Sequence, residues 1–248
     1  MRSGENVGRI VGMLLLAHLA AGLMVPFIML DRVRGSGGFL AGAAASSGQL
    51  RAAVLLLFAG SAVSVGIAIA GLPVFRRYSS AMALWLLALS VAGFALQAVD
   101  NGALLSTLSL SQQYAAAGPA KTELFEALAG VVLSARKWAH YSYLLVVGIW
   151  IFLLYALLYR FRLVPRALAA FGLVGSLLQI TGVTMRGLLG YSPVTVLAMP
   201  LAPAYVALAV WLMVKGFDER HRPLRAEANE DDHQGPAAPS SAPSGQRG

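Results

Sequence analysis

The sequence predicts an all-α membrane protein, a polytopic bundle of six transmembrane helices. Of its 248 residues, 58% are hydrophobic and only 12% are charged, and the mean hydropathy is +0.69. A soluble domain carries about 25% charged residues, so a chain this apolar needs lipid as its solvent. Each of six apolar stretches has about twenty residues, the length that crosses a hydrocarbon core of about 30 Å. They are roughly 9–30, 52–75, 80–100, 138–159, 167–185 and 193–214.

The first stretch follows Arg2 and Arg9, which raises the alternative of a cleaved signal peptide. The apolar part of a signal peptide has only about 7–15 residues. The stretch from Ile10 to Leu30 is longer and contains a histidine and a proline. We therefore expect an uncleaved transmembrane span.

Tight arginine-rich turns join the second span to the third, at 76–79, and the fourth to the fifth, at 160–166. Pro73 lies just before the first turn, and Pro165 lies within the second. Because proline cannot donate a backbone hydrogen bond, we expect both to mark helix ends. Lys215 directly follows the sixth span.

Two other connections are long. Residues 31–50 are rich in Gly, Ala and Ser and are expected to be flexible. Residues 101–137 are largely compatible with helix, and Gly118-Pro119 is the expected break. Within this connection, the apolar spacing over 120–135 fits an amphipathic helix lying on the membrane surface. A seventh, short buried helix fits the same spacing.

The end of the chain differs from the rest. Residues 218–248 are polar and end in a run rich in Pro and Ser, so they cannot bury apolar surface. We expect a disordered cytoplasmic tail there, and a transmembrane domain over residues 1–217.

The positive charges predict the orientation. With the N-terminus inside, twelve of the nineteen Lys and Arg residues lie on the inner side, which favours cytoplasmic N and C termini. The net charge of +8 could suggest nucleic acid. However, the basic residues lie at helix ends rather than on one face, so we expect the bilayer and no nucleic acid as partner.

Small residues lie in stripes along several spans, where they let helices approach closely in lipid. Such stripes serve packing within one bundle or a homodimer interface, and the sequence leaves both open. The stripes are Gly8 and Gly12 in the first span, Gly60, Ser64 and Ala68 in the second, and Gly172, Gly175, Ser176 and Gly182 in the fifth.

Several chemistries are excluded or unsupported. The chain has no cysteine, which excludes disulfides and thiolate metal sites, and it lacks the common hydrolase and nucleotide-binding motifs. His18 and His140 could be considered as axial haem ligands. Counted along their helices, they differ in depth by more than about 10 Å, so no cofactor and no metal is expected.

Polar side chains gather at a similar height near the outer ends of the third, fourth and fifth spans. Polar groups at depth are costly and are candidates for function. Asp100 could pair with Arg136, Lys137 or Arg186, and His140 could donate to it. The set is interpreted as a pocket for a small polar molecule or lipid headgroup, as an acid–base site of Asp100 and His140, or as interfacial anchoring. The candidate residues are Gln97, Asp100, Asn101, Arg136, His140, Gln179 and Arg186.

Three motifs lie in the fourth to sixth spans: Ala-His-Tyr-Ser-Tyr at 139–143, Leu-Leu-Tyr-Arg-Phe-Arg-Leu-Val-Pro-Arg at 157–166, and Ala-Val-Trp-Leu-Met-Val-Lys-Gly at 209–216. They resemble a bacterial membrane family known as domain of unknown function 4386. The similarity covers roughly residues 7–217. It implies a membrane fold and the bacterial inner membrane, but no reaction.

The resemblance also implies positions for polar residues of the family. Its histidine falls on His140, and its Arg-x-x-Glu pair falls on Gln97 and Asp100, so the acid is kept in type and the base is lost. A family glutamate falls on Tyr205. Both departures remove charge from the bundle.

The sequence therefore favours a non-enzymatic membrane protein that binds a lipid or small molecule or scaffolds partners. A small transporter or channel component is the first alternative. A membrane enzyme using Asp100 and His140 is the second.

Overall fold

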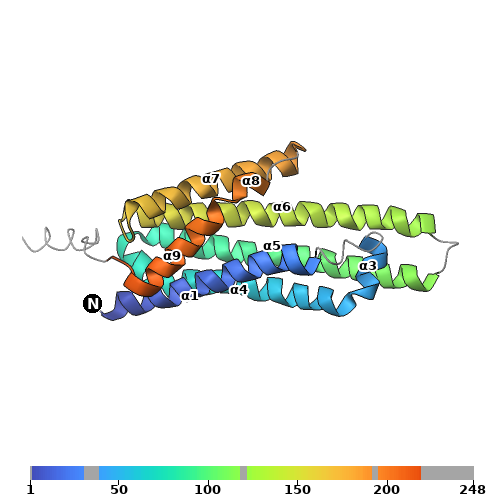
Figure 1. Ribbon diagram of the computed structural model, residues 1–248, viewed down its shortest axis with the longest axis horizontal. Coiled ribbons are helices and arrows are strands. Elements are labelled where there is room, and N and C mark those ends of the chain that lie inside the picture. Colours follow the sequence, from blue (N-terminus) through green and yellow to red (C-terminus); the bar gives the residue numbers. More distant parts are fainter. Residues whose placement is uncertain (1, 31–38, 118–121, 192–194, 219–248) are drawn as a thin grey trace, which may run out of the picture.

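The computed structural model describes residues 2–30, 39–117, 122–191 and 195–218. These residues fold into helices joined by short turns, in an elongated bundle (Figure 1). In chain order the elements are α1 (Arg2–Met24), the π-helix η1 (Val25–Met29), α3 (Phe39–Ala45), α4 (Ser47–Tyr78), α5 (Ser80–Ala117), α6 (Thr122–Arg160), α7 (Arg166–Leu188), α8 (Thr195–Ala198) and α9 (Leu201–Lys215).

Six helices within the described residues are long and apolar enough to cross a membrane, which confirms the predicted fold class. Their outward faces carry large exposed apolar side chains, such as Leu55, Trp85 and Val214. In water such faces would be costly, whereas hydrocarbon solvates them. The six ranges are Glu5–Met29, Ser47–Tyr78, Ser80–Ala117, Thr122–Arg160, Arg166–Gly187 and Val196–Lys215.

The long helices α4, α5 and α6 lie side by side along the length of the molecule, and α5 is the middle one (Figure 1). α1 packs against α4 and α9, and α7 packs against α6 and α9. In Figure 1, α9 crosses α1 near the end that holds the N-terminus.

Both ends of the membrane domain lie at this same end of the bundle. The backbone of Gly216 lies next to Gly8, and the backbone N–H of Asp218 donates to the carbonyl of Leu163 in the turn between α6 and α7 at 2.8 Å. The turn between α4 and α5, with Arg76 beside it, lies here too. We call this side the arginine-rich end.

α5 and α6 are much longer than the spans predicted within them. They have 38 and 39 residues, or about 57 Å each at 1.5 Å per residue. The prediction of a separate helix at 120–135, either on the membrane surface or short and buried, is therefore wrong. From Thr122 onward, this segment is the first part of α6. No glycine pair or proline interrupts the chain between Thr122 and Arg160, so the helix continues through its polar residues. Gly118-Pro119 lies outside the described residues.

Two other expectations need correction. The predicted flexible connection 31–50 contains α3 and the start of α4, and Ser111 of α5 holds α3 by accepting the backbone N–H of Ala44 at 2.8 Å. Residues 31–38 lie outside the described residues, as does the predicted tail from 219 onward.

Pro73 does not end a helix but lies inside α4, which runs on to Tyr78. Neighbouring helices allow proline within a membrane helix.

The stripes of small residues pack inside the bundle. At Gly12 a Cβ would lie 2.7 Å from the carbonyl oxygen of Ala209, so only glycine lets α1 and α9 cross this closely. A Cβ on Gly172 would run into the ring of Tyr155, and one on Gly60 would meet Ala21 at 3.0 Å. These contacts account for the stripes within one chain, and a homodimer stays a prediction.

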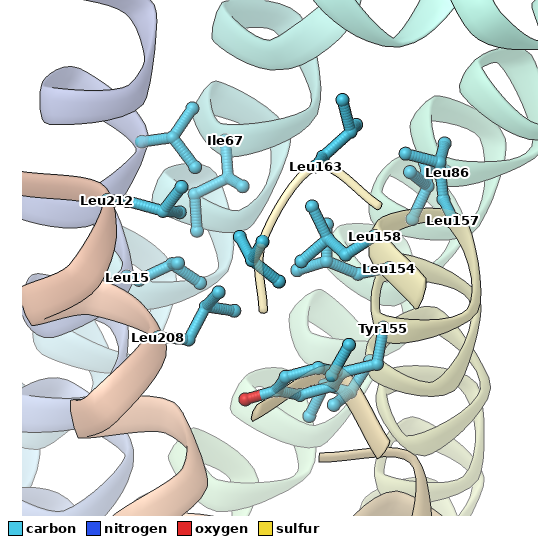
Figure 2. Packing of buried hydrophobic residues seen from close by; sticks show 14 of the residues in the cluster. Leu15, Ile67, Leu86, Leu154, Tyr155, Leu157, Leu158, Leu163, Leu208 and Leu212 are labelled. Atoms are coloured by element: carbon cyan, nitrogen blue, oxygen red, sulfur yellow. The ribbon is translucent and has the colours of Figure 1, made fainter. Parts of the chain in front are cut away.

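The main hydrophobic core lies toward the arginine-rich end. Leucines from several helices meet there, among them Leu15 of α1, Leu154 of α6 and Leu208 of α9 (Figure 2). Tyr155 lies below them in Figure 2, with its hydroxyl oxygen in the interior. This core fixes the helices on which the polar residues stand.

Candidate functional site

A cavity of about 330 Å³ lies inside the bundle, beyond the main core as seen from the arginine-rich end. α1, η1, α4, α5, α6, α7, α8 and α9 all contribute to its wall. The residues that line it through polar side chains are His18, Gln97, Asp100, Arg136, His140, Tyr143, Gln179 and Tyr205. Since every membrane-spanning helix reaches this one space, the fold itself builds the site.

Asp100 is the centre of its polar wall. Its side chain is 1% exposed, and Arg136 Nε lies 3.6 Å from Asp100 Oδ1. His140 Nδ1 lies 3.1 Å from Asp100 Oδ2. Asp100 stands twenty residues from the start of α5 and His140 twenty residues from the end of α6, so both lie about 30 Å from the arginine-rich end. The predicted pairing of Asp100 with Arg136 and His140 is thus present in the structure.

Gln97 and Asn101 extend this group along one face of α5. The three α5 residues are three and four positions apart, a spacing that places them on the same side of a helix. Gln97 Nε2 donates to Asn101 Oδ1 at 3.0 Å and to Asp100 Oδ2 at 3.4 Å. Asn101 donates in turn to the carbonyl of Val54 on α4 at 3.4 Å. We call Gln97, Asp100, Arg136 and His140 the Asp100 cluster.

The remaining predicted residues are placed differently. Gln179 of α7 lines the cavity, and its Oε1 accepts no hydrogen bond among the described residues. Asn101 lies behind the wall, where it supports Gln97. Arg186 is not among the cavity-lining residues. Lys137 is exposed, and its ammonium lies 5.6 Å from the ring of Trp138 rather than on Asp100.

A second polar group lies closer to the arginine-rich end, and sequence reasoning did not find it. His18 of α1 packs against Trp150 of α6 and Tyr205 of α9, with ring centroids 6.1 and 6.2 Å apart. Its Nδ1 lies 2.9 Å from the carbonyl of Gly60. Because a carbonyl only accepts, Nδ1 carries the hydrogen. We call His18, Trp150 and Tyr205 the His18 cluster.

From the sequence alone, Trp150 and Tyr155 fit membrane-interface belts or internal packing. In the structure they are packed inside, and Trp150, Tyr155 and Tyr205 are all buried in the core. The sequence does, however, indicate that the three residues of the His18 cluster lie at a similar depth in the membrane. His18, Trp150 and Tyr205 stand nine or ten residues from Arg9, Arg160 and Lys215, or about 15 Å from the same end.

The rest of the wall is apolar and includes a break in helix geometry. Val25, Pro26 and Phe27 line the cavity from η1, where the α-helical hydrogen-bond pattern gives way to a π-helix at the proline. Such π-segments occur often at functional sites. Phe27 also has an exposed side chain, so the cavity borders the outer surface of the bundle beside η1.

The arrangement is suited to holding a molecule through hydrogen bonds at defined points and apolar contact between them. Asp100 carries its charge in an interior position where only paired charges are tolerated. Arg136 and His140 supply the pairing, so the cluster is compact and close to neutral. Among the described residues, no three His, Asp or Glu side chains come together as a metal site.

Fold and site together define a polytopic α-helical membrane protein with a polar cavity inside its bundle. The family described as Domain of unknown function (DUF4386) matches residues 10–216. The chain belongs to that family, which confirms the resemblance seen in the sequence. No curated protein and no solved structure matches the chain significantly.

Proposed function

We propose that this protein is a non-enzymatic membrane protein that binds a small lipid or another small amphipathic molecule in the cavity. The observation that carries the proposal is the composition of the cavity wall. The Asp100 cluster forms a polar wall, whereas Leu19, Leu23 and Phe27 are among the apolar residues that line the rest. Ligand sites characteristically combine mostly apolar walls with a few placed polar groups.

The size of the cavity limits the ligand. Sites for small molecules have volumes of about 300–1,000 Å³, and this cavity of about 330 Å³ lies at the lower bound. A single slender chain fits that space, whereas a two-chain phospholipid does not. The exposed side chain of Phe27 at the border of the cavity supports access from the lipid phase.

The charges of the wall limit the polar end of the ligand. Asp100 and Arg136 neutralise each other at 3.6 Å. Gln179 Oε1 accepts no hydrogen bond among the described residues, and Asp100 Oδ1 has only its ionic contact with Arg136. Acceptors that can take a further hydrogen bond beside a neutral pair favour an uncharged donor, such as a hydroxyl group, over an ion.

For the location, we propose the bacterial inner membrane with both termini in the cytoplasm. The arginine-rich end is then the cytoplasmic side, in agreement with the bias of positive charge, and the Asp100 cluster lies toward the outside. Because the chain has no cysteine, single Arg77→Cys and Gly130→Cys variants can be labelled in intact cells with a membrane-impermeant maleimide. We expect the reagent to label Gly130→Cys but not Arg77→Cys. Labelling of Arg77→Cys alone would show that the orientation is the opposite of the proposed one.

Binding is tested by native mass spectrometry of the full chain released from mild detergent. We expect a defined adduct on the wild-type protein, a strongly reduced adduct on Asp100→Asn, and an unchanged adduct on Lys137→Met, which alters an exposed charge one residue from Arg136. Gln179→Leu, which leaves the ion pair intact, is expected to weaken the adduct as well.

Folding of each variant is checked by circular dichroism and gel filtration. A bare wild-type chain, or an adduct that persists in Asp100→Asn and Gln179→Leu alike, would overturn the proposal.

A further inference from the structure

We infer that the His18 cluster is a second polar subsite of the cavity, so that the bound molecule carries an oxygen function at each end. The first is the hydroxyl held by the Asp100 cluster. The second is a hydroxyl or carbonyl oxygen held by the His18 cluster. This inference rests on the proposed function and narrows its ligand to a slender molecule that is polar at both ends.

Two hydrogen-bond donors of the cluster are buried without an acceptor. Trp150 is 2% exposed and Tyr205 is 3% exposed. Neither the indole N–H nor the phenol oxygen has a hydrogen-bond partner among the described residues. Buried polar groups are nearly always paired, and these lie about 15 Å from the end of the bundle, where the bilayer offers no water. Tyr205 lines the cavity and Trp150 does not, so the Tyr205 hydroxyl is the donor that an oxygen acceptor in the cavity would satisfy.

His18 supplies the complementary acceptor. Its Nδ1 donates to the carbonyl of Gly60, so in the neutral imidazole Nε2 is an acceptor. The His18 side chain lines the cavity, as does that of Tyr205. A ligand hydroxyl accepts from a donor of the cluster and donates to His18, whereas a carbonyl only accepts. Both fit, and a hydroxyl uses the site more fully.

The spacing of the two clusters sets the length of the ligand. Trp150 and His140 are ten residues apart on α6, or about 15 Å along the helix axis. The wall between the two levels is apolar, with Leu144 and Val147 of α6 lining the cavity. A saturated chain of about twelve carbons with an oxygen at each end spans a comparable distance. A charged group at the inner end would find no counter-ion in the cluster, which contains no carboxylate, lysine or arginine.

The test compares two probes that differ by one hydroxyl. Wild-type protein in mild detergent is titrated with 1,12-dodecanediol and with 1-dodecanol, and the bound fraction is read by native mass spectrometry. The diol is expected to bind about fivefold more tightly, the effect of one additional net hydrogen bond. Tyr205→Phe removes a single hydroxyl and keeps the ring, and it is expected to abolish this preference while 1-dodecanol binding is retained. Tyr191→Phe, at an exposed position, is the matched control.

The outcomes separate this inference from the proposed function. If both alcohols bind equally to the wild-type protein, or if the preference survives in Tyr205→Phe, the second subsite is refuted while the cavity remains a binding site. If Asp100→Asn does not weaken the binding of either alcohol, the proposed function fails, and this inference fails with it.

Discussion

The ion pair between Asp100 and Arg136 gives a prediction whose size follows from the structure. The two groups lie 3.6 Å apart, with side-chain exposures of 1% and 14%. Their Coulomb energy is about 5 kcal/mol at an effective dielectric constant of about 20. Removing one partner of a buried pair typically costs about 3–5 kcal/mol, because the other charge stays behind uncompensated.

Arg136→Met is therefore expected to lower the free energy of unfolding by about 3 kcal/mol. His140 keeps part of the compensation through its contact with Asp100 at 3.1 Å, although its side chain is 42% exposed and its effect is screened. Asp100→Asn combined with Arg136→Met removes both charges, and we expect it to recover at least about 2 kcal/mol relative to the sum of the single variants.

The assay is steric trapping of the unfolded state in lipid bicelles, applied to a double-mutant cycle. Lys137→Met is the matched control, because it removes the neighbouring but exposed cation, and its expected effect is below about 0.5 kcal/mol. Equal losses for Arg136→Met and Lys137→Met would refute the reasoning. So would a double variant in which the two losses simply add.

Two further predictions concern packing and lipid contact. Gly12→Ala places a Cβ 2.7 Å from the Ala209 carbonyl oxygen, so we expect its thermal unfolding midpoint to fall well below that of the wild type. Gly130→Ala is the control, because a Cβ there meets nothing within 4 Å, and we expect it to be neutral or stabilising. Equal midpoints for the two variants would contradict the close α1–α9 crossing. The second prediction uses tryptophan fluorescence in brominated-lipid vesicles. A variant that retains only Trp85, which is 63% exposed, should be quenched strongly, whereas a variant that retains only Trp150 should be nearly unaffected. Similar quenching of both variants would contradict the assigned lipid-facing surface.

The spans could be predicted because the hydrocarbon thickness sets the length of an apolar helix. The Asp100 cluster could be predicted because polar residues are rare in these spans, so that a shared height on three helices is informative. Asp100, Arg136 and His140 accordingly meet in the structure. Their function as a ligand site stays a proposal.

The His18 cluster escaped prediction for a physical reason. Helices as uniformly apolar as α6 and α9 do not reveal which face is turned inward, so the sequence does not show that Trp150 and Tyr205 lie beside His18. The lengths of α5 and α6 escaped prediction as well, because segments such as 122–137 are compatible with either a separate helix or a continuation. Only the packing of neighbouring helices decides between these alternatives.

The central claim is that the cavity holds a molecule, and blocking the cavity tests it most directly. Gly22 is exposed but lines the cavity, and a Cβ there meets nothing within 4 Å, so we expect Gly22→Phe to obstruct the cavity without replacing any of its polar residues. Gly48→Phe introduces the same side chain at an exposed position with equally open surroundings. In native mass spectra, we expect the adduct to disappear from Gly22→Phe and to persist in Gly48→Phe. Equal adducts on both variants would contradict the account.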